Sequence, residues 1–575
     1  MKKTQPRFWW VIDSIILVLL TVIFGVWFFK AHAYGAWGDD SPGYIYTAGQ
    51  VQNGEALVVQ DNLVQAALAW FGDEHFARFV APAHHEIISP SGWTASRYPI
   101  GLSVLMALAN KLTGQDTAMY AIVPLAAVGV VLLTYLLAVL WLPTNPPLKR
   151  VGAMVAALSV GLSDVFANYA VAQPMREIPA LLFWLAALLL LTFINRVQLM
   201  RWKIILAICA GLLFGYSINI RETSAVLLVP VLVWLWPVGR VWWKSRVERS
   251  AFIKIVLAGC AGLLIALSLS IWNSAAITAH KEKFREKDIS SIAITSNFDH
   301  IQSLSPSNLF NNQGKFKPGV GGVVQYWEVM SQFSTFAPFL FFALIGLFLT
   351  WWQQRRLAYV LASWIAVVFI LFAMWINPYA RYILPLLPAV AILSAYGMVG
   401  IIEYVGKKLQ LSRFVSIGLS LLLMAAFFIS LQPAIAARNE HIRLGDSVYK
   451  AITAEDLSTL KTVSDQLLVK ASPEKPALLM MFGSWRAGLP ETIMTHSDLR
   501  VIRFPGRPNE QPDLTALAGF MAELQKTYTV YVWYDATLGT GEQRLFQQLS
   551  LSEPILTTQL SFQADIVIYA LTAND

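Results

Sequence analysis

Long apolar stretches dominate this chain and set the strongest limit on how it can fold. Of its 575 residues, 56% are hydrophobic and only 14% are charged, whereas a typical soluble domain carries roughly 25% charged residues. Many apolar runs reach the roughly 18 residues that a helix needs to cross a bilayer. Backbone groups in lipid must bond to each other, so these runs predict transmembrane helices.

The fold class that follows is an α-helical polytopic membrane protein with about eleven transmembrane helices. The expected spans cover residues 8–29, 117–142, 150–168, 178–195, 203–218, 224–238, 251–273, 335–352, 357–376, 382–404 and 413–431. The first run ends before Ala31-His32-Ala33, which looks like a signal-peptidase site. Because this run exceeds the roughly 7–15 residues of a secretory h-region, we expect an uncleaved signal anchor.

Positive residues fall in every second loop between the predicted spans. Lys and Arg are retained in cytoplasmic loops because they resist translocation. The pattern therefore predicts a multi-pass protein of the bacterial inner membrane, with its N-terminus in the cytoplasm and its C-terminus in the periplasm. It also accounts for the formal charge of +8 without a nucleic-acid partner. The residues are Lys2, Lys3, Arg7, Lys149, Arg150, Arg196, Arg201, Lys203, Arg240, Lys244, Arg246, Arg249, Arg355, Arg356, Lys407, Lys408 and Arg413.

Three long segments lie on the predicted outer side. Residues 1–432 form the transmembrane domain, with a first outer loop at 30–116 and a second at 274–334, which contains Gly319-Val320-Gly321-Gly322. Within the first loop, the apolar stretch Pro99–Leu112 is too short to span, so we expect a helix at the outer membrane surface.

Residues 433–575 read as an extracytoplasmic α/β domain. Strand-like runs occur at Ala477–Phe482, Val501–Phe504, Tyr528–Tyr534 and Ile566–Leu571, and helical patterns occur near 441–469, 513–526 and 541–549. No Gly-rich phosphate loop opens any of these helices, so we expect no nucleotide site. The sequence favours a packing or acceptor-recognition module.

Two adjacent carboxylates follow the first span, in Gly38-Asp39-Asp40-Ser41-Pro42-Gly43-Tyr44. Asp39 or Asp40 could act as a general base on an acceptor hydroxyl, or could hold a divalent cation. The alternative is a solvated turn, because Asp, Ser, Pro and Gly favour turns.

Four arginines sit at the outer ends of different predicted spans: Arg97, Arg176, Arg221 and Arg381. Each alone could be an interfacial anchor. Positive residues are normally avoided on this side, so the set indicates an anionic ligand. A guanidinium binds phosphate through two parallel hydrogen bonds, which makes phosphate the expected group.

No metal ligands are assigned. His84-His85-Glu86 lacks the ligand spacings of zinc sites, and Cys209 and Cys260 both fall inside predicted spans. A divalent cation therefore stays open only as the alternative role of the Asp pair. His280-Lys281, after the seventh span, could also meet a phosphate.

The order of four motifs resembles the integral-membrane glycosyltransferases of the C superfamily, above all the protein O-mannosyltransferase-like enzymes and the lipid A aminoarabinose transferase. The motifs are Asp39-Asp40 with Tyr44, Arg97-Tyr98-Pro99-Ile100-Gly101, Met175-Arg176-Glu177-Ile178-Pro179-Ala180, and Arg381-Tyr382-Ile383-Leu384-Pro385-Leu386-Leu387-Pro388. Ile100 replaces a second proline of the family pattern. Relatives usually carry Asp-Glu or Glu in place of Asp39-Asp40, which leaves open which carboxylate is catalytic.

The resemblance implies transfer of a sugar from a polyprenyl-phosphate donor to an envelope acceptor, which could be a glycolipid, a polysaccharide or a protein. It implies that Asp39 or Asp40 takes the acceptor proton and that the four arginines hold the donor phosphate. Tyr44, Tyr98, Glu177 and Tyr382, which belong to the same motifs, are the expected substrate-binding residues.

Two other classes of protein compete with this interpretation. A transporter or lipid flippase typically shows internal repeats and charges at mid-membrane depth, whereas here the charges cluster at helix ends and no repeat is visible. A non-catalytic relative could act as a scaffold through its C-terminal domain, in which case replacing Asp39 and Asp40 would have no effect.

Overall fold

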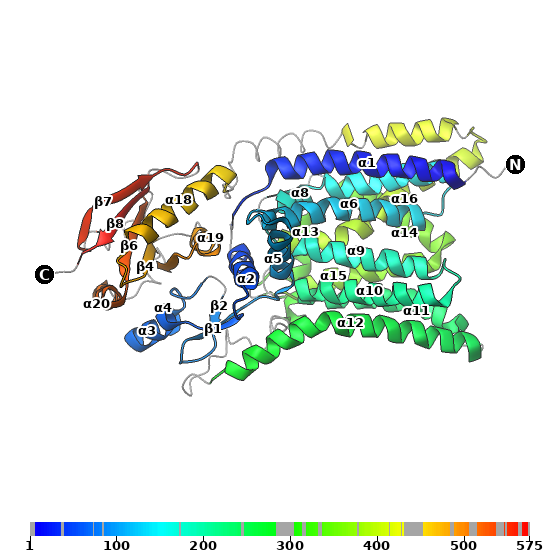
Figure 1. The fold of residues 1–575 in the computed structure, drawn as a ribbon. Coiled ribbons are helices and arrows are strands. Elements are labelled where there is room, and N and C mark those ends of the chain that lie inside the picture. Colours follow the sequence, from blue (N-terminus) through cyan, green and yellow to red (C-terminus); the bar gives the residue numbers. More distant parts are fainter. Residues whose placement is uncertain are drawn as a thin grey trace.

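The computed structural model describes residues 6–572 except for seventeen internal gaps (Figure 1). The gaps are residues 36–39, 73, 83–84, 172–173, 243–245, 283–303, 313–317, 332–335, 376–378, 413, 427, 430–451, 483–487, 505–513, 536–545, 547–548 and 562–565. Asp39, His84, most of the predicted helix at 541–549 and the start of that at 441–469 lie outside the described residues.

A bundle of long apolar helices forms most of the molecule. Its helices are α1 (Pro6–Ala31), α6 (Ile122–Trp141), α7 (Pro146–Gly161), α8 (Asp164–Val171), α9 (Glu177–Ile194), α10 (Met200–Ile220), α11 (Leu228–Trp242), α12 (Arg246–His280), α14 (Phe336–Gln353), α15 (Arg355–Ala373) and α16 (Leu387–Lys408). Short 3₁₀ segments lead into three of them: η1 (Ala118–Ala121), η2 (Glu222–Leu227) and η5 (Ala380–Leu386).

The predicted polytopic class is confirmed, while the number of spans stays a prediction. Seven helices in the described part of the chain are long and apolar enough to cross a membrane. An eighth span results if α7 and α8, which are bent by 58° at a short break, count as one. The remaining predicted spans correspond to shorter apolar helices at Glu222–Trp236, Leu340–Gln353 and Phe414–Ala426.

Glycines let two pairs of bundle helices approach very closely. A Cβ on Gly211 or Gly262 would collide with the backbone across the α10–α12 contact, and one on Gly346 or Gly397 would do so between α14 and α16. Lipid supplies no hydrophobic drive for helix association, so close backbone packing through small residues takes its place.

The segments predicted to be outside gather at one end of the bundle, opposite the N-terminus (Figure 1). From the first loop come α2 (Ser41–Asn53), β1 (Val58–Gln60), α3 (Asn62–Phe71), α4 (Glu74–Ala77), β2 (His85–Ile87), β3 (Trp93–Ser96) and α5 (Gly101–Thr113). The second loop supplies η4 (Pro306–Leu309) and α13 (Gly322–Ser331). The three short strands form an antiparallel sheet in the order β1-β3-β2.

The predicted surface helix in the first loop exists as α5, and it begins at the glycine of the Arg97–Gly101 motif. A Cβ on Gly101 would lie 2.6 Å from the carbonyl oxygen of Asn219, at the end of α10. The Tyr216 hydroxyl also donates a 2.9 Å hydrogen bond to the Gly101 carbonyl. Glycine therefore lets the start of α5 dock on α10, which places the preceding Tyr98 above the bundle.

The C-terminal part is the expected α/β domain, with strand order β5-β4-β6-β8-β7. Strands β5, β4 and β6 are parallel, and β8 and β7 extend the sheet antiparallel. The sequence did not predict β7 or α19, and the first part of the helix predicted near 441–469 lies outside the described residues. The elements are α18 (Ala454–Lys470), β4 (Ala477–Phe482), α19 (Leu489–His496), β5 (Arg500–Phe504), α20 (Leu514–Thr527), β6 (Thr529–Asp535), β7 (Leu551–Thr558) and β8 (Ile566–Leu571).

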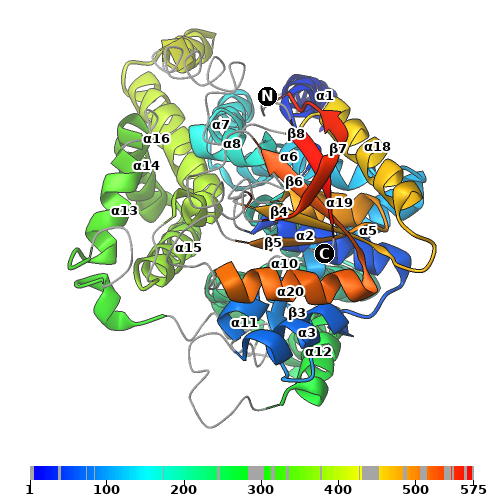
Figure 2. The same ribbon diagram turned by 90° about the vertical axis from the view of Figure 1, so that its left-hand side faces the viewer.

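The first outer loop and the C-terminal sheet share their apolar cores. Tyr44 and Met106 of the loop pack in one cluster with Leu479 of β4, and Val64 packs in another with Met480. Trp70 of α3 donates a 2.8 Å hydrogen bond to the Ala516 carbonyl of α20. Figure 2, which views the molecule from the sheet end, shows α20 beside α3. The predicted boundary at 432/433 divides the sequence, but the apolar packing joins the parts on its two sides.

Candidate active site

Five segments meet where the outer loops reach the bundle. Asp40 directly precedes α2, and Tyr98 lies between β3 and α5. Two contributions are an arginine that precedes a helix and the glutamate that begins it: Arg176 with Glu177 of α9, and Arg221 with Glu222 of η2. The last is Arg381 with Tyr382 in η5. The fold thus brings together residues from four of the motifs that the sequence singles out.

Asp40 is held by two partners in a buried position. Its Oδ1 atom accepts a 2.6 Å hydrogen bond from the Tyr98 hydroxyl, and Arg381 Nη2 lies 2.6 Å from its Oδ2 atom. Although Asp40 occupies the N-cap position of α2, its side chain makes no capping hydrogen bond. The carboxylate is therefore turned toward the charged residues rather than toward its own helix.

The remaining charges form a network of opposite signs. Glu177 Oε1 lies 3.5 Å from Arg221 Nη1 and 3.6 Å from Arg381 Nε. Arg176 Nη1 donates a 2.8 Å hydrogen bond to Glu222 Oε2. With Asp40, three carboxylates face three guanidiniums, so this cluster is balanced in formal charge. Balance of this kind offsets part of the cost of removing each charge from water.

Aromatic rings line the cluster. The Arg221 guanidinium lies 5.0 Å from the ring centres of both Phe372 and Tyr382, and that of Arg381 lies 5.0 Å from the ring of Tyr379. Arg176 stands 5.1 Å from the Tyr98 ring. Contacts between cations and ring faces stabilise guanidiniums that have lost their water.

Several polar atoms in this cluster have no hydrogen-bond partner in the described part of the structure. They are the Tyr44 hydroxyl, Arg176 Nε, Glu177 Oε2, Arg221 Nε and Nη1, Glu222 Oε1 and Arg381 Nε. Buried polar groups are normally hydrogen-bonded, and exceptions concentrate where a protein binds ligands or stores strain. The cluster therefore offers both donors and acceptors to a polar ligand.

Burial is the largest single influence on the pKa values of Tyr44, Tyr98 and Arg176. It raises the pKa of Tyr44 and of Tyr98 well above the usual value, with Arg176 opposing the effect at Tyr44 and the Asp40 charge adding to it at Tyr98. Both phenols therefore stay protonated and can donate hydrogen bonds. Burial lowers the pKa of Arg176, but Glu222, Tyr44 and Glu177 outweigh it and raise the pKa overall.

Arg97 is the one predicted phosphate ligand that the structure places away from this cluster. Its Nη1 atom lies 3.7 Å from Glu86 Oε1 on β2, and its side chain is 39% exposed. Arg176, Arg221 and Arg381 are all buried side by side in the network, with at most 12% of each side chain exposed. The sequence motif that contains Arg97 thus contributes its tyrosine to the cluster.

The described residues contain no group of three or more His, Cys, Asp or Glu side chains that could hold a metal ion. The His85 ring meets the Tyr46 ring edge-on, with ring centres 5.1 Å apart. Its Nε2 atom lies 3.3 Å from Gln50 Oε1. His280 packs against Trp93, with ring centres 4.0 Å apart.

Two residues that were not among the predicted site residues belong to this region. Glu222 follows Arg221 directly and pairs with Arg176, so the Arg-Glu repeat in two outer loops was an available signal. Tyr326 of α13 is fully buried, and the groups that act on its hydroxyl include Tyr382, Arg221 and Arg381. It lies in the second outer loop, where no motif marked it.

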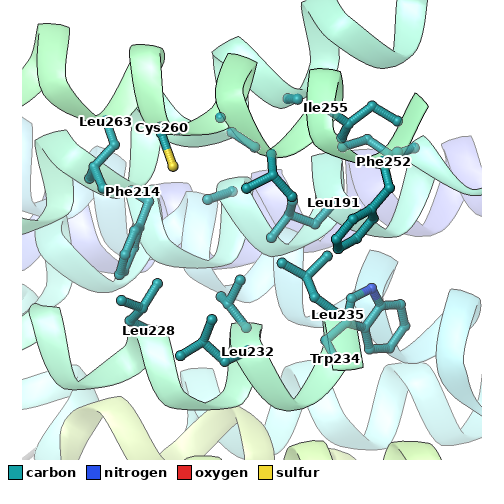
Figure 3. Close-up of a pocket in the computed structure, with 18 of the residues that line it drawn as sticks. Leu191, Phe214, Leu228, Leu232, Trp234, Leu235, Phe252, Ile255, Cys260 and Leu263 are labelled. Atoms are coloured by element: carbon teal, nitrogen blue, oxygen red, sulfur yellow. The ribbon is translucent and has the colours of Figure 1, made fainter. Parts of the chain in front are cut away.

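Two cavities lie along the same helices. A small one is lined by Glu177, Ala180, Leu181, Arg221, Thr223, Ser224, Val226, Leu227, Val368, Phe372 and Pro385. A larger one, of about 180 Å³, begins one turn further along α9 and α11 (Figure 3). Its wall is formed by apolar side chains of α9, α10, α11 and α12, including Trp184, Phe214, Leu228, Leu232 and Cys260.

The family model of dolichyl-phosphate-mannose-protein mannosyltransferases matches residues 97–272. The matched segment contains Tyr98 and the Arg-Glu pairs at 176–177 and 221–222, which contribute most of the charged cluster. No curated protein sequence matches the chain.

Solved membrane enzymes share the fold along almost the whole chain. ArnT from Cupriavidus metallidurans, bound to undecaprenyl phosphate, is 12% identical, with a TM-score of 0.54 over 99% of both chains. The oligosaccharyltransferase of Archaeoglobus fulgidus in its apo form is 13% identical, with a TM-score of 0.51 over 93% of this chain and 70% of its own.

The same archaeal enzyme, AglB, in complex with an inhibitory peptide and dolichol phosphate, is 12% identical. Its TM-score is 0.50, over 97% of this chain and 74% of its own. These likenesses and the family model confirm the resemblance found in the sequence. The chain is a multi-pass membrane protein that shares the fold of these enzymes.

Proposed function

We propose that this protein transfers a sugar from a polyprenyl-phosphate donor to a hydroxyl group of an envelope acceptor, at the outer face of the bacterial inner membrane. One observation carries the proposal. A buried carboxylate, Asp40, lies 2.6 Å from the Arg381 guanidinium, in a cluster that contains two further buried arginines. A base next to phosphate-binding cations is what transfer from a sugar phosphate requires.

In the proposed reaction, the acceptor oxygen attacks the anomeric carbon of the donor sugar. The bond between that carbon and the phosphate oxygen breaks, and its electron pair leaves with the polyprenyl phosphate. The acceptor proton passes to the carboxylate of Asp40. Arg221 and Arg381 stabilise the charge that develops on the leaving phosphate, which is an electrostatic role of the kind that often dominates catalysis. Asp39 stays an alternative base.

The contact between Asp40 and Arg381 links donor binding to the state of the proposed base. The Tyr98 hydroxyl and Arg381 Nη2 each hold one oxygen of the Asp40 carboxylate in position. A donor phosphate competes with Asp40 for the Arg381 guanidinium. If the phosphate takes this guanidinium, the Oδ2 atom of Asp40 becomes free to accept the proton of the acceptor hydroxyl.

The apolar cavity in Figure 3 suits the polyprenyl tail of such a donor. Glu177, Ala180 and Leu181 line the small cavity at the cluster, and Trp184 on the next turn of α9 lines the large one. A lipid whose phosphate lies at Arg221 would therefore direct its chain between α9 and α11. Burial of each methylene group contributes about 0.8 kcal/mol.

The C-terminal domain is the proposed site of acceptor recognition. Its helix α19 packs on α2, the helix that begins directly after Asp40. A Cβ on Gly49 of α2 would lie 3.3 Å from the Thr495 side chain, so the two helices are in close contact. An acceptor held by the domain would thus be held near the base. The acceptor is proposed as a glycolipid, a polysaccharide or a protein of the envelope.

Sugar transfer by the purified protein tests the proposal. The assay supplies radiolabelled polyprenyl-phosphate sugars and a crude envelope extract, and it compares the wild type with Asp40→Asn and Asp39→Asn. We expect transfer by the wild type and a loss of at least about a hundredfold in the variant that lacks the base. Folded variants that transfer as well as the wild type would contradict the assignment, and the absence of transfer from every donor would favour a transporter or a scaffold.

A further inference from the structure

The glycine run Gly319-Val320-Gly321-Gly322 in the second outer loop has no part in the proposed reaction, yet it fixes where α13 lies. A Cβ on Gly322 would collide with the Ala373 carbonyl at the end of α15, and one on Gly321 would collide with the Leu309 carbonyl of η4. Gly319 adopts a positive φ of 85°, which glycine tolerates best. The run therefore lets α13 begin directly against the bundle.

This docking turns one residue of α13 inward. Tyr326 is 0% exposed, whereas its neighbour Trp327 is 53% exposed. The Tyr326 ring lies 6.4 Å from that of Phe369 on α15. Tyr326 belongs to the same buried cluster as Phe372 and Tyr382, and the rings of these two residues lie 5.0 Å from the Arg221 guanidinium. The second outer loop thus places Tyr326 beside the charged cluster.

The hydroxyl of Tyr326 has a hydrogen to donate and no acceptor for it among the residues that the structure describes. An unused donor in a buried site is unfavourable unless a ligand accepts a hydrogen bond from it. Burial also raises the pKa of Tyr326, with Tyr382 adding and Arg221 opposing, so the proton is retained.

We propose that Tyr326 is a substrate-contacting residue, which donates a hydrogen bond from the second outer loop to an anionic oxygen of the phosphate held by Arg221 and Arg381. The inference rests on the proposed function, because it places the donor phosphate in the charged cluster. It adds a residue that encloses this phosphate from the side opposite the first outer loop. It also assigns a purpose to the glycine run, which positions Tyr326.

Binding of undecaprenyl phosphate and of the uncharged undecaprenol to the full-length protein in nanodiscs tests the inference. The ratio of the two affinities isolates the phosphate from the tail. We expect Tyr326→Phe to lower the preference for the phosphate by at least about tenfold, because hydrogen bonds to charged groups are the strong ones. Binding of undecaprenol should not change.

Tyr396→Phe is the matched control. Tyr396 is also buried, and its hydroxyl likewise has no hydrogen-bond partner in the described residues, but it lies in α16, and Glu403 is the charged group that acts on it. This variant should keep the wild-type preference. Gly322→Ala provides a second test that leaves Tyr326 in place, and it should reduce the preference by displacing α13.

The outcomes separate the two proposals. If the wild type prefers the phosphate and Tyr326→Phe retains that preference in full, the role of Tyr326 is wrong while the proposed function stands. If the wild type binds undecaprenol and undecaprenyl phosphate equally well, the proposed phosphate site itself is wrong. Loss of preference in Tyr326→Phe but not in Tyr396→Phe would establish the contact.

Discussion

Arg381 Nη2 lies 2.6 Å from Asp40 Oδ2, although the two residues are 341 positions apart in the sequence. Only 12% of the Arg381 side chain and 10% of the Asp40 side chain are exposed. The pair links the first outer loop to η5, near the end of the membrane bundle. Only the tertiary structure thus brings the candidate base next to this cation.

Replacing Arg381 with alanine should weaken donor binding more than it slows the chemical step. The change also leaves the buried carboxylates of Asp40 and Glu177 without this partner, and breaking a buried pair typically costs about 3–5 kcal/mol of stability. Donor affinity and kcat of the purified variant measure the first effect, and thermal unfolding measures the second. Lys407→Ala, at an exposed pair with Glu403, should change none of the three. Unchanged donor affinity in Arg381→Ala would count against the assignment.

Arg97 and Arg221 should differ in their effect on donor binding. Arg97 is 39% exposed and lies 3.7 Å from Glu86, whereas Arg221 is 2% exposed within the charged cluster. We expect Arg221→Ala to lower the affinity for a polyprenyl phosphate by at least about tenfold, and Arg97→Ala to lower it by less than about threefold. Equal losses would show that Arg97 moves to the phosphate when the donor binds.

Tyr98→Phe should lower kcat while leaving the affinity for the donor nearly unchanged. The variant keeps the ring that packs 5.1 Å from Tyr44, and it removes the 2.6 Å hydrogen bond that orients Asp40. Loss of a hydrogen bond to a charged group costs about 1.5–3 kcal/mol, which corresponds to roughly 10–150-fold in rate if it acts on the transition state. Steady-state kinetics separates kcat from KM, and a change confined to KM would contradict an orienting role.

Gly101→Ala should destabilise the protein and reduce its activity. The added Cβ would lie 2.6 Å from the Asn219 carbonyl, so α5 has to shift away from α10 and carry Tyr98 with it. Overpacking of this kind typically costs about 1–3 kcal/mol. Gly25→Ala in α1 is the matched control, because no atom lies within 4 Å of its added Cβ. Thermal unfolding of both variants would decide the point, and equal midpoints would refute the close approach.

His496 should make the contact between the C-terminal domain and the bundle sensitive to acid. Burial, with the charge of Lys461 adding and that of Asp116 opposing, lowers the pKa of His496 from 6.5 to about 4. Its Nε2 atom is 2.8 Å from the Tyr120 hydroxyl. Because the unfolded chain binds a proton here near pH 6.5 and the folded chain only near pH 4, stability falls as the pH drops through that window.

The loss from His496 amounts to at most about 3.5 kcal/mol, since each unit of pKa shift corresponds to about 1.4 kcal/mol. Thermal unfolding of the wild type and of His496→Asn between pH 7 and pH 4 measures it. The variant should be less stable at pH 7 and should show a smaller decrease toward pH 4. Parallel decreases in the two proteins would mean that other groups cause the acid sensitivity.

The sequence by itself determined the helical membrane class and several strands of the C-terminal domain, because these depend on local patterns of apolar residues. Strands β4 and β8 have the predicted bounds, and α5 occupies the short apolar stretch after Arg97. The sequence analysis did not predict α19, which has only eight residues, or β7, whose burial does not alternate along the strand. Short or weakly periodic elements gain their stability from packing rather than from local pattern.

Only the tertiary structure decided which polar residues meet. The sequence placed Arg97 with Arg176, Arg221 and Arg381 because all four follow the same local rule, yet the fold separates Arg97 from the other three. The fold also adds Glu222, which the repeated Arg-Glu pair could have signalled, and Tyr326, which no motif marked. Charge pairing and burial depend on contacts between distant segments, so a pattern of neighbouring residues cannot specify them.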